Sequence, residues 1–411
     1  MRYFRNSELT RLYNVSDKAV RNWIDATQQG KLKLELLEYD DKTYIADTLH
    51  NNFILEELVH RGKKFRNRRT HKELAPSSNF YSLYGPKQVI DIANSLDKYR
   101  EIPTHYRYFG EGATYWDAYL HKLYDAGISN ILTATIELLR LDREYLDSLF
   151  DNYEYVNVVD VGVGNSLAAK ELLQYLHDKG KLKRYIGIDS SKDLLDIAEQ
   201  NIDNWFSNTI KIEKYVRDIN YERFAEALAA DSFGKDATAT INVLLFLGAT
   251  VGNFREPSQA LQTIRESMGK DDILITSDKL DSENARRFFD FNIESDKTTL
   301  SLRNRFLLDL LAIEESFYDV EQFFDEQQKS RFIQVRLKVE VSIQFKVGSF
   351  QKKIELRRGE SILLFRIWEW TDRELVNLYE KNKFSQLRVT KSRNQEYILI
   401  ISKIDNSIKP S

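Results

Sequence analysis

The sequence predicts an α/β protein built on a doubly wound parallel sheet, preceded by a small helical module with a β-hairpin. Two observations predict the sheet. Apolar runs alternate with helical patterns from Val156 onward, and glycines or acids stand directly after those runs. The module is predicted by two short amphipathic segments before residue 33, followed by a stretch of alternating residues. At 411 residues the chain is long enough for two or three domains.

Composition supports a globular protein with enough apolar residues for these cores. Hydrophobic residues make up 42% of the chain and aromatic residues 12%. No apolar run approaches the length of a membrane span, and no signal-peptide pattern opens the chain, so no membrane partner is expected. Cysteine is absent, which excludes disulfides and thiolate metal sites and fits a reducing cytoplasm. The six histidines show no metal-ligand spacing; we expect them on the surface and expect no metal site.

The segment SELTRLYNVSDKAVRNWIDATQQGKL, residues 7–32, has the pattern of two short helices joined by a tight turn. Leu9 and Leu12 are expected to face a core, and Ser16 is expected to cap the second helix. The following KLKLELLEY and KTYIA, separated by Asp40-Asp41, predict a β-hairpin. This order resembles the winged helix-turn-helix of MerR-type and excisionase-type regulators.

The charge of this module makes duplex DNA a candidate partner for residues 1–75. These residues carry 15 Lys/Arg against 11 Asp/Glu, a net charge of +4, whereas the whole chain has −3. Two readings stay open. The basic run RGKKFRNRRTHK could instead be a solvated linker between domains, and the helix-turn-helix could dock a protein. The candidate nucleic-acid contacts are Lys18, Arg21, Lys63, Lys64, Arg66, Arg68 and Arg69.

Five apolar runs predict the parallel strands of the sheet. YVNVVDVGVGNS ends in Gly162 and Gly164, and a helix is expected from Ser166. RYIGIDSS ends in Asp189, and TIKIEKYVRDI carries Asp218 at its end. TATINVLLFLGATVGN and DDILITSDKL are the fourth and fifth runs. In a doubly wound sheet the ligand site lies at the carboxyl ends of such strands.

The loop after the first strand narrows the choice of ligand. Gly162-x-Gly164 lets the backbone approach a bound group, and Asp189 is placed to accept hydrogen bonds from both ribose hydroxyls. That pair fits either a dinucleotide or S-adenosylmethionine. The third glycine of the dinucleotide fingerprint is replaced by Leu167, which favours S-adenosylmethionine. Asp218 is then a candidate partner of the adenine amino group.

The stretch LLFLGATVGNF, together with VDVGVGNS, resembles the histidine-specific S-adenosylmethionine-dependent methyltransferases, relatives of the enzyme that trimethylates the histidine α-amine in ergothioneine biosynthesis. YFGEGATYWDAYL, NILTATIELL and the late GESI are weaker matches, and the likeness covers roughly residues 106–403. It implies a seven-stranded, Rossmann-like class I methyltransferase sheet with an α/β substrate lobe. We expect the sheet at about 150–280 and 371–404, and the lobe at about 80–140 and 281–370.

The resemblance also implies roles for single residues. Asn253 falls on the asparagine that holds the acceptor's amino group, and Tyr108 falls on a tyrosine of the amino-acid pocket, so both are catalytic candidates; Glu111 is a second candidate base. The candidate cofactor-binding residues are Gly162, Gly164, Asn165, Ser166, Asp189, Asp218, Phe246 and Gly248. The candidate substrate-binding residues are Tyr108, Trp116, Asn130, Asn253, Phe365 and Ile367.

Three departures from the family pattern bear on the substrate. Asn130 stands where the family has a second pocket tyrosine, and Phe365 and Ile367 stand where it has a carboxylate and a hydroxyl for the imidazole. A buried imidazole NH would then lack an acceptor. We therefore expect an N-methyltransferase for an amino acid or related small amine other than histidine. The alternative is a DNA-binding regulator whose degenerate methyltransferase domain senses S-adenosylmethionine. No base-methylation motif is seen.

Overall fold

The computed structural model describes residues 3–39, 42–127, 129–229, 239–282 and 298–405, without the side chains of residue 61 and residues 63–70. The chain forms two compact units. The first comprises residues 1–73 and 339–342, and the second comprises residues 74–338 and 343–411. Each unit has its own hydrophobic core.

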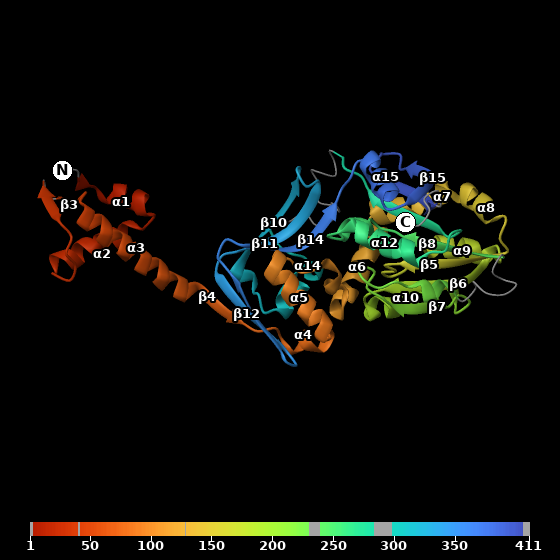
Figure 1. The fold of residues 1–411 in the computed structure, drawn as a ribbon, viewed down its shortest axis with the longest axis horizontal. Helices are drawn as coiled ribbons and strands as arrows, with labels where there is room; N and C mark the ends of the chain where they lie inside the picture. Colours follow the sequence, from red (N-terminus) through yellow and green to blue (C-terminus); the bar gives the residue numbers. More distant parts are fainter. Residues whose placement is uncertain (1–2, 40–41, 128, 230–238, 283–297, 406–411) are drawn as a thin grey trace, which may run out of the picture. The chain divides into compact units, whose positions relative to one another are not determined.

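The first unit begins with two short helices and a three-stranded sheet of order β1-β3-β2 (Figure 1). The side chain of Ser16 accepts a hydrogen bond from the backbone N–H of Ala19, which confirms the expected cap. The unit contains β1 (Tyr3–Phe4), α1 (Asn6–Tyr13), α2 (Asp17–Gln28), β2 (Leu36–Tyr39), β3 (Lys42–Ala46) and α3 (Leu49–Thr70).

One expectation for this unit needs correction. Leu9 is buried, but Leu12 is 61% exposed, because the short α1 packs through Leu9 and Tyr13, one turn apart on the same face. Residues 61–70 of the basic run lie on α3. The candidate contacts Lys63, Lys64, Arg66, Arg68 and Arg69 are on this helix, and their side chains lie outside the described part of the structure.

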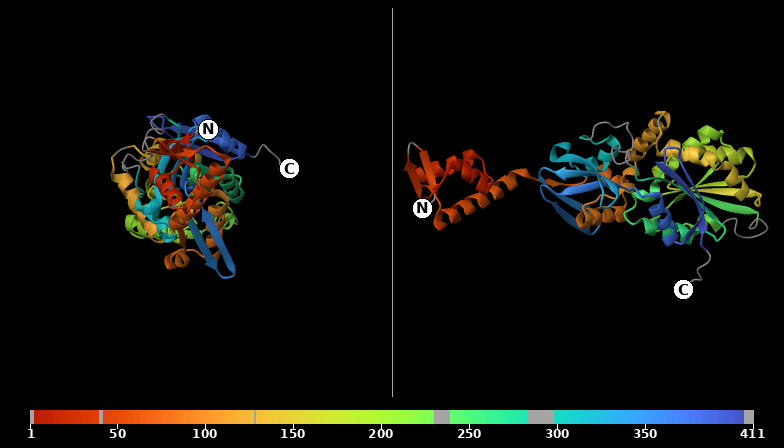
Figure 2. Two further views of the ribbon diagram at one scale, coloured as in Figure 1. Left: turned by 90° about the vertical axis from the view of Figure 1, so that its left-hand side faces the viewer. Right: turned by 90° about the horizontal axis from the view of Figure 1, so that it is seen from above.

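The second unit is built on a seven-stranded sheet of order β15-β16-β9-β8-β5-β6-β7. The pairs among β9, β8, β5, β6 and β7 are parallel, and β16 is antiparallel to both its neighbours. The view from above in Figure 2 shows these strands as a twisted sheet between helices. The strands are β5 (Tyr155–Val161), β6 (Leu182–Asp189), β7 (Ile212–Val216), β8 (Thr240–Phe246), β9 (Ile273–Lys279), β15 (Phe384–Lys391) and β16 (Tyr397–Ile404).

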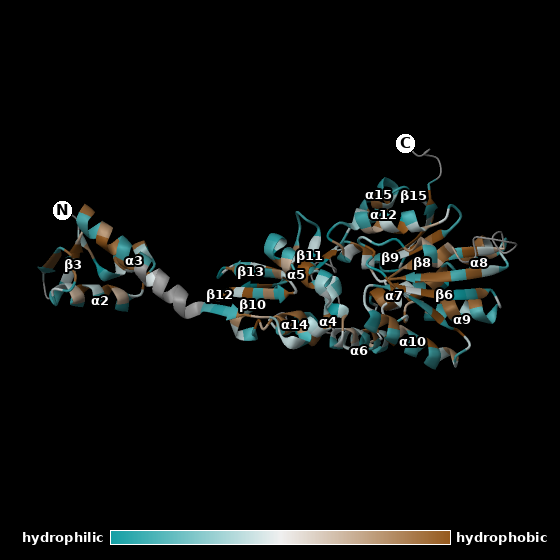
Figure 3. Cartoon of the chain, turned by 60° about the horizontal axis from the view of Figure 1, so that its bottom comes forward, coloured by the Kyte–Doolittle hydropathy of each residue, from teal (hydrophilic) through white to brown (hydrophobic). Residues whose placement is uncertain are grey.

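Helices cover both faces of this sheet, so its central strands are apolar on both sides (Figure 3). In β5, Val156 and Val158 face one core cluster, whereas Val159 and Val161 face the other. One face is covered by α7 (Ile131–Leu141), α8 (Arg143–Phe150), α9 (Lys170–Asp178) and α10 (Lys192–Phe206), and the other by α11 (Ala225–Leu228), α12 (Pro257–Ser267) and α15 (Asp372–Lys381).

The helix after the first strand begins later than the sequence suggests. It was expected from Ser166, but α9 begins at Lys170. Ser166 has a φ of 65°, which is left-handed and cannot belong to an α-helix. The side chain of Asn165 accepts a hydrogen bond from the N–H of Leu167 and so stabilises a turn in place of the first helical turn.

The remaining elements of the second unit form a lobe beside the carboxyl ends of the strands. One of its sheets has the order β10-β11-β14, and another sheet has the order β13-β12-β4. The elements are α4 (Ser78–Leu83), α5 (Pro86–Tyr99), η1 (Thr104–Tyr108), α6 (Glu111–Asp125), α14 (Leu302–Leu310), η5 (Glu315–Phe317), β10 (Tyr318–Asp325), β11 (Ser330–Leu337), β12 (Glu340–Val347), β13 (Phe350–Leu356) and β14 (Ser361–Trp368). Strand β4 (His71–Leu74), up to Glu73, and residues 340–342 of β12 belong to the first unit.

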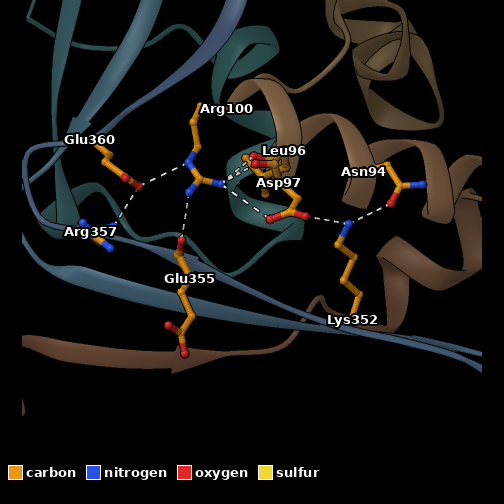
Figure 4. Close-up of polar contacts among 8 residues, drawn as sticks. All are labelled: Asn94, Leu96, Asp97, Arg100, Lys352, Glu355, Arg357 and Glu360. Carbon is orange, nitrogen blue, oxygen red and sulfur yellow. Dashed lines mark hydrogen bonds and ion pairs between the residues drawn. The ribbon is translucent and has the colours of Figure 1, made fainter.

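Arg100, directly after α5, bonds to β13 and to the turn that precedes β14 (Figure 4). Its guanidinium donates to the carbonyl oxygens of Asp97 and Glu355, at 2.7 and 3.3 Å, and its Nε lies 3.3 Å from Glu360 Oε2. Lys352 adds an ion pair to Asp97 at 2.8 Å. Glu360, from the GESI match, therefore holds the lobe together and does not line the cavities described below.

Candidate functional site

Two adjoining cavities lie at the carboxyl edge of the seven-stranded sheet. The outer cavity has a volume of about 390 Å³ and the inner cavity about 120 Å³. The outer one is lined by strand ends and by the lobe segment from α5 to η1, and the inner one reaches β14 and α14. Because they share lining residues, a group bound in one would touch a group bound in the other. The shared residues are Trp116, Gly162, Gly164, Gly248, Thr250 and Asn253.

Two carboxylates from neighbouring strands face the outer cavity. Asp189 ends β6, and its oxygens accept from the N–H groups of Ser191, at 2.9 Å, and Gly164, at 3.4 Å. Burial raises the pKa of Asp189 to about 6 despite these bonds. Asp218 follows β7 and accepts from the N–H and the side-chain amide of Asn220. The two acids thus stand side by side at the edge where a nucleoside would bind.

His105 also lines the outer cavity, which corrects the expectation that all six histidines are on the surface. It lies on η1, its ring centroid is 4.0 Å from that of Tyr106, and its Nε2 is 4.0 Å from Asp218 Oδ2. Burial lowers the pKa of His105, which favours the neutral ring. The lobe segment lies beside the strand ends and leaves about 24% of this side chain exposed.

Glycines shape the wall between the two cavities. Gly162, Gly164 and Gly248 have φ values of 71°, 55° and 78°, a region that other residues avoid. At Gly252 a Cβ atom would lie 2.9 Å from the carbonyl oxygen of Trp368 and 3.0 Å from Ile367 Cγ1. Gly252 therefore lets β14 of the lobe approach the end of β8.

Asn253 ends the short helix η4 (Thr250–Asn253) and lines both cavities. The turn before it is held by two bonds, from Thr250 Oγ1 to the carbonyl oxygen of Leu247 and from Gly248 N–H to Ser277 Oγ. The Oδ1 atom of Asn253 is buried and has no hydrogen-bond partner among the described residues. A buried amide oxygen without a donor is unfavourable, so the site is suited to a ligand that brings an N–H or O–H group.

The inner cavity combines apolar walls with several buried charges. Four of the expected substrate-binding residues line it, namely Trp116, Asn253, Phe365 and Ile367. Asp160 also lines it, accepts from the hydroxyl of Tyr185 at 3.0 Å, and has its pKa raised by burial to about 7. Basic and amide groups complete the polar lining: Arg107, Asn165, Lys279, Arg303 and Asn304.

Most of the expected cofactor residues lie together, but two do not. Gly162, Gly164, Asp189, Asp218 and Gly248 line the outer cavity, and Asn165 lines the inner one. Ser166 is buried, and its Oγ lies 2.8 Å from the hydroxyl oxygen of Tyr185, whose proton goes to Asp160. Phe246 is buried in the core beside Phe254, because β8 is buried on both faces and turns its last side chain into the core.

Of the other residues expected to bind substrate or take part in catalysis, only some line a cavity. Tyr108 lines the outer cavity. Asn130 lines neither cavity, because it is the N-cap of α7: its Oδ1 accepts from two backbone N–H groups, and its amide donates to the carbonyl oxygen of Leu123. Glu111 lies outside both cavities, and its carboxylate accepts from the hydroxyl of Tyr115. The substitution of tyrosine by Asn130 thus changes a helix cap, not a pocket wall.

Some lining residues were not foreseen. Asp160 has a signal in the sequence, because it is an acid near the end of an apolar run and two residues before Gly162. Arg107, Arg303 and Asn304 have none, since Arg107 and Asn304 meet across 197 residues of chain. Only the folded lobe brings them together.

Within the described ranges, no cluster of three histidine, cysteine or acidic residues could hold a metal ion. The same residues include no helix long and apolar enough to cross a bilayer.

Most of the chain matches the model of a known protein family. The model of the family described as "Histidine-specific methyltransferase, SAM-dependent" matches residues 89–404. A search of curated proteins gives no match. Among solved structures, an S-adenosylmethionine-dependent methyltransferase from Clostridium acetobutylicum is 13% identical, with a TM-score of 0.41 and 70% of this chain and 98% of that chain covered.

Two further solved structures are similar at the same low level. Magnesium protoporphyrin IX methyltransferase from Synechocystis, with bound S-adenosylhomocysteine, is 10% identical, with a TM-score of 0.37 and coverages of 77% and 99%. Human N-acetylserotonin methyltransferase, in complex with S-adenosylmethionine, is 12% identical, with a TM-score of 0.36 and coverages of 98% and 87%. The family match spans most of the chain, and the chain therefore belongs to the histidine-specific, S-adenosylmethionine-dependent methyltransferases.

Proposed function

We propose that this methyltransferase acts on the nitrogen of an amino acid or related small amine other than histidine. The observation that carries the proposal is the buried, unpartnered Oδ1 of Asn253 at the junction of the two cavities. An amide oxygen there would accept an N–H of the acceptor and turn the nitrogen lone pair toward the cofactor. Such orientation supplies much of the acceleration in a displacement of this kind.

The outer cavity fits the nucleoside part of the cofactor. Asp189 would accept from the ribose hydroxyls, and Asp218 with His105 would face the adenine. When bound, S-adenosylmethionine supplies a methyl group whose S–C bond breaks toward sulfur as the acceptor's lone pair forms the N–C bond, leaving S-adenosylhomocysteine and a proton. Asp160, facing the inner cavity, is suited to hold an ammonium group.

The other lining residues would exclude water and unsuitable acceptors and would orient the substrate. Trp116 and Phe365 keep water from the junction of the cavities. Tyr108 Oη accepts a hydrogen bond from Arg107 at 2.8 Å and keeps its own proton to donate. Phe365 and Ile367 offer no acceptor for an imidazole N–H, which supports the exclusion of histidine. The geometry gives no support to Glu111 as a base.

The test is a screen of amino acids and amines for release of S-adenosylhomocysteine. With the best acceptor, we expect Asn253→Ala to lower kcat/KM by about 100-fold, because a positioning contact is lost, while affinity for S-adenosylhomocysteine changes less than about threefold. Asn394→Ala, in an exposed turn, is the matched control. A protein that binds S-adenosylhomocysteine but methylates nothing in a broad panel would favour the sensing regulator.

We also propose that the first unit is a winged helix-turn-helix that contacts duplex DNA without methylating it. What supports this is the sequence of α1, a three-residue turn, α2 and the β2–β3 hairpin, with Lys18 and Arg21 exposed on α2. Arg21 is paired with Asp17 at 2.6 Å, which weakens its availability to phosphate.

Mobility-shift titrations of the full chain at two salt concentrations test this second proposal. Lys18→Ala with Arg21→Ala should weaken binding and flatten its salt dependence, whereas Lys31→Ala, elsewhere on the same unit, should not. Equal binding by all three proteins would leave the unit without a nucleic-acid role. Methyl transfer to the DNA would contradict the small-molecule acceptor.

A further inference from the structure

Arg107 is a buried cation in the wall of the inner cavity, and the proposed transfer does not yet use it. Only 5% of the residue is exposed. It lies near the end of η1, where the first turn of α6 presses against its backbone: a Cβ atom at Gly112 would lie 2.0 Å from the carbonyl oxygen of Arg107. The fold therefore fixes the point from which the guanidinium reaches the cavity.

The guanidinium has only neutral partners. Its two terminal nitrogens donate to Asn304 Oδ1, at 3.0 Å, and to Tyr108 Oη, at 2.8 Å, while its buried Nε has no hydrogen-bond partner among the described residues. Aromatic rings surround it, with centroids 4.6 Å away for Phe365 and 5.7 Å for Trp116. No carboxylate in the described part of the chain forms an ion pair with it.

A buried guanidinium without an ion-pair partner is energetically unfavourable in the free protein. Arginine stays protonated even when buried, and a buried charge is usually matched by an opposite charge. Burial lowers the pKa of Arg107, and the nearby cation Arg303 adds to that effect. Aromatic faces and two neutral acceptors compensate only part of the lost hydration. The arrangement is incomplete without an anion.

Two further cations line the inner cavity, Arg303 and Lys279, and Lys279 Nζ lies 3.9 Å from Glu369 Oε1. Asp160 is the carboxyl group among the described lining residues, and burial raises its pKa to about 7, so it offers less than a full negative charge near neutral pH. The outer cavity, by contrast, carries Asp189 and Asp218 and does not include Arg107.

We infer that the methyl acceptor is an anionic amine, whose carboxylate or phosphate group pairs with Arg107 while its nitrogen lies at Asn253. The inference rests on the proposed transfer to nitrogen and names its substrate class. Both anions can accept two parallel N–H bonds from a guanidinium. Arg107, Asn304 and Phe365 all come from the lobe, on η1, α14 and β14, so the contact belongs to the acceptor side.

The experiment compares matched acceptor pairs on the full-length protein. Glutamate with glutamine and phenylalanine with its amide differ in a carboxylate, and phosphoserine with serine differ in a phosphate. The wild-type protein should prefer the acidic member of at least one pair by tenfold or more in kcat/KM. Arg107→Gln should reduce that ratio to less than about threefold, and Arg107→Lys should restore part of it. Arg366→Gln, a half-buried arginine that already pairs with Glu101 at 3.4 Å, is the control.

A second variant keeps the inference testable if Arg107→Gln does not fold. Asn304→Asp places a carboxylate beside Arg107 and should weaken the acidic acceptor at least tenfold, with unchanged affinity for S-adenosylhomocysteine. An unaltered acid preference in both variants would overturn the inference. So would a loss of S-adenosylhomocysteine affinity with the acid preference intact, because Arg107 would then hold the cofactor.

Binding measurements separate this inference from the proposed function. Calorimetric titration of each pair into the complex with S-adenosylhomocysteine needs no turnover. If no acceptor is methylated, the transfer to an amine fails, but tighter binding of the acidic member that depends on Arg107 would still support an anion site. Equal binding of both members would overturn it.

Discussion

The outer and inner cavities share a wall, but key charged side chains reach them from different parts of the chain. Two carboxylates of the outer cavity, Asp189 and Asp218, stand at or just after the ends of β6 and β7, behind apolar runs. The two arginines of the inner cavity, Arg107 and Arg303, come from η1 and α14, which are far apart along the chain. The pair of acids can therefore be predicted from local sequence, whereas the pair of arginines comes together only in the folded lobe.

The two cavities also differ in charge. The described lining of the outer one has five carboxylates, including Asp189 and Asp218, and two arginines, whereas that of the inner one has Asp160 and three cations, Arg107, Arg303 and Lys279. A sulfonium nucleoside is cationic and would be drawn to the first, and an anionic amine would be drawn to the second. The two ligands would therefore be drawn to opposite sides of Asn253.

The largest effect is expected at Asp189, the acid of the outer cavity that directly ends strand β6. Asp189→Asn keeps the shape of the side chain but removes the charge that accepts from the ribose hydroxyls. We expect affinity for S-adenosylhomocysteine to fall more than tenfold, and by up to about 3 kcal/mol, as for hydrogen bonds to a charged group. Calorimetry at pH 8 measures it, with Asp203→Asn as control, because Asp203 pairs with Lys211 and lines neither cavity. A change below threefold would mean that the strand-end acid does not hold the cofactor.

The next effect is expected at Gly252, where the end of β8 meets β14 of the lobe. Gly252→Ala pushes a methyl group into the backbone of β14 at Trp368 and should lower the free energy of unfolding by about 2 kcal/mol, as overpacking does. Thermal unfolding measures it. Gly85→Ala, at the N-cap of α5 with φ of −68° and its nearest neighbour at 3.8 Å, is the matched control. Equal melting temperatures for Gly252→Ala and the wild-type protein would contradict this expectation and show that β14 can shift to accommodate the methyl group.

These contrasts explain what could be read from the sequence. The five parallel strands, the capping Ser16, and the pair of Gly162 and Asp189 follow from local pattern, because parallel strands bring their carboxyl ends to one edge. Ser166 and Phe246 were expected at the cofactor because they stand in the matching motifs, but Ser166 is buried in a left-handed turn and Phe246 lies in the core. No motif around Arg107 predicts its place in the inner cavity, because that place depends on contacts that only the tertiary fold creates.

The pH dependence of cofactor binding should show whether an acid of the outer cavity or one of the inner cavity controls the affinity. Asp189 has a pKa of about 6 in the free protein, and its charged form is the better acceptor for ribose hydroxyls. Affinity for S-adenosylhomocysteine should therefore rise as pH increases from 5 to 7, by at most about tenfold, or ~1.4 kcal/mol, per unit below pH 6. Asp189→Asn should remove this rise. If the variant keeps the full dependence, the titrating group lies in the inner cavity, at Asp160.

The smallest effect is expected in the scaffold of the lobe, at the ion pair between Arg100 and Glu360. About a third of each side chain is exposed, so screening by water limits Glu360→Gln to less than about 1 kcal/mol of unfolding free energy. The loss should shrink further in 1 M salt, where the Debye length is about 3 Å. Glu355→Gln, whose exposed carboxylate lies 3.7 Å from Lys353, is the control. Because Glu360 lines neither cavity, affinity for S-adenosylhomocysteine should stay within twofold. A tenfold loss of this affinity would show that the Arg100–Glu360 pair is energetically coupled to the cofactor residues at the strand ends. The lobe and the strand ends could then no longer be treated as independent parts of the site.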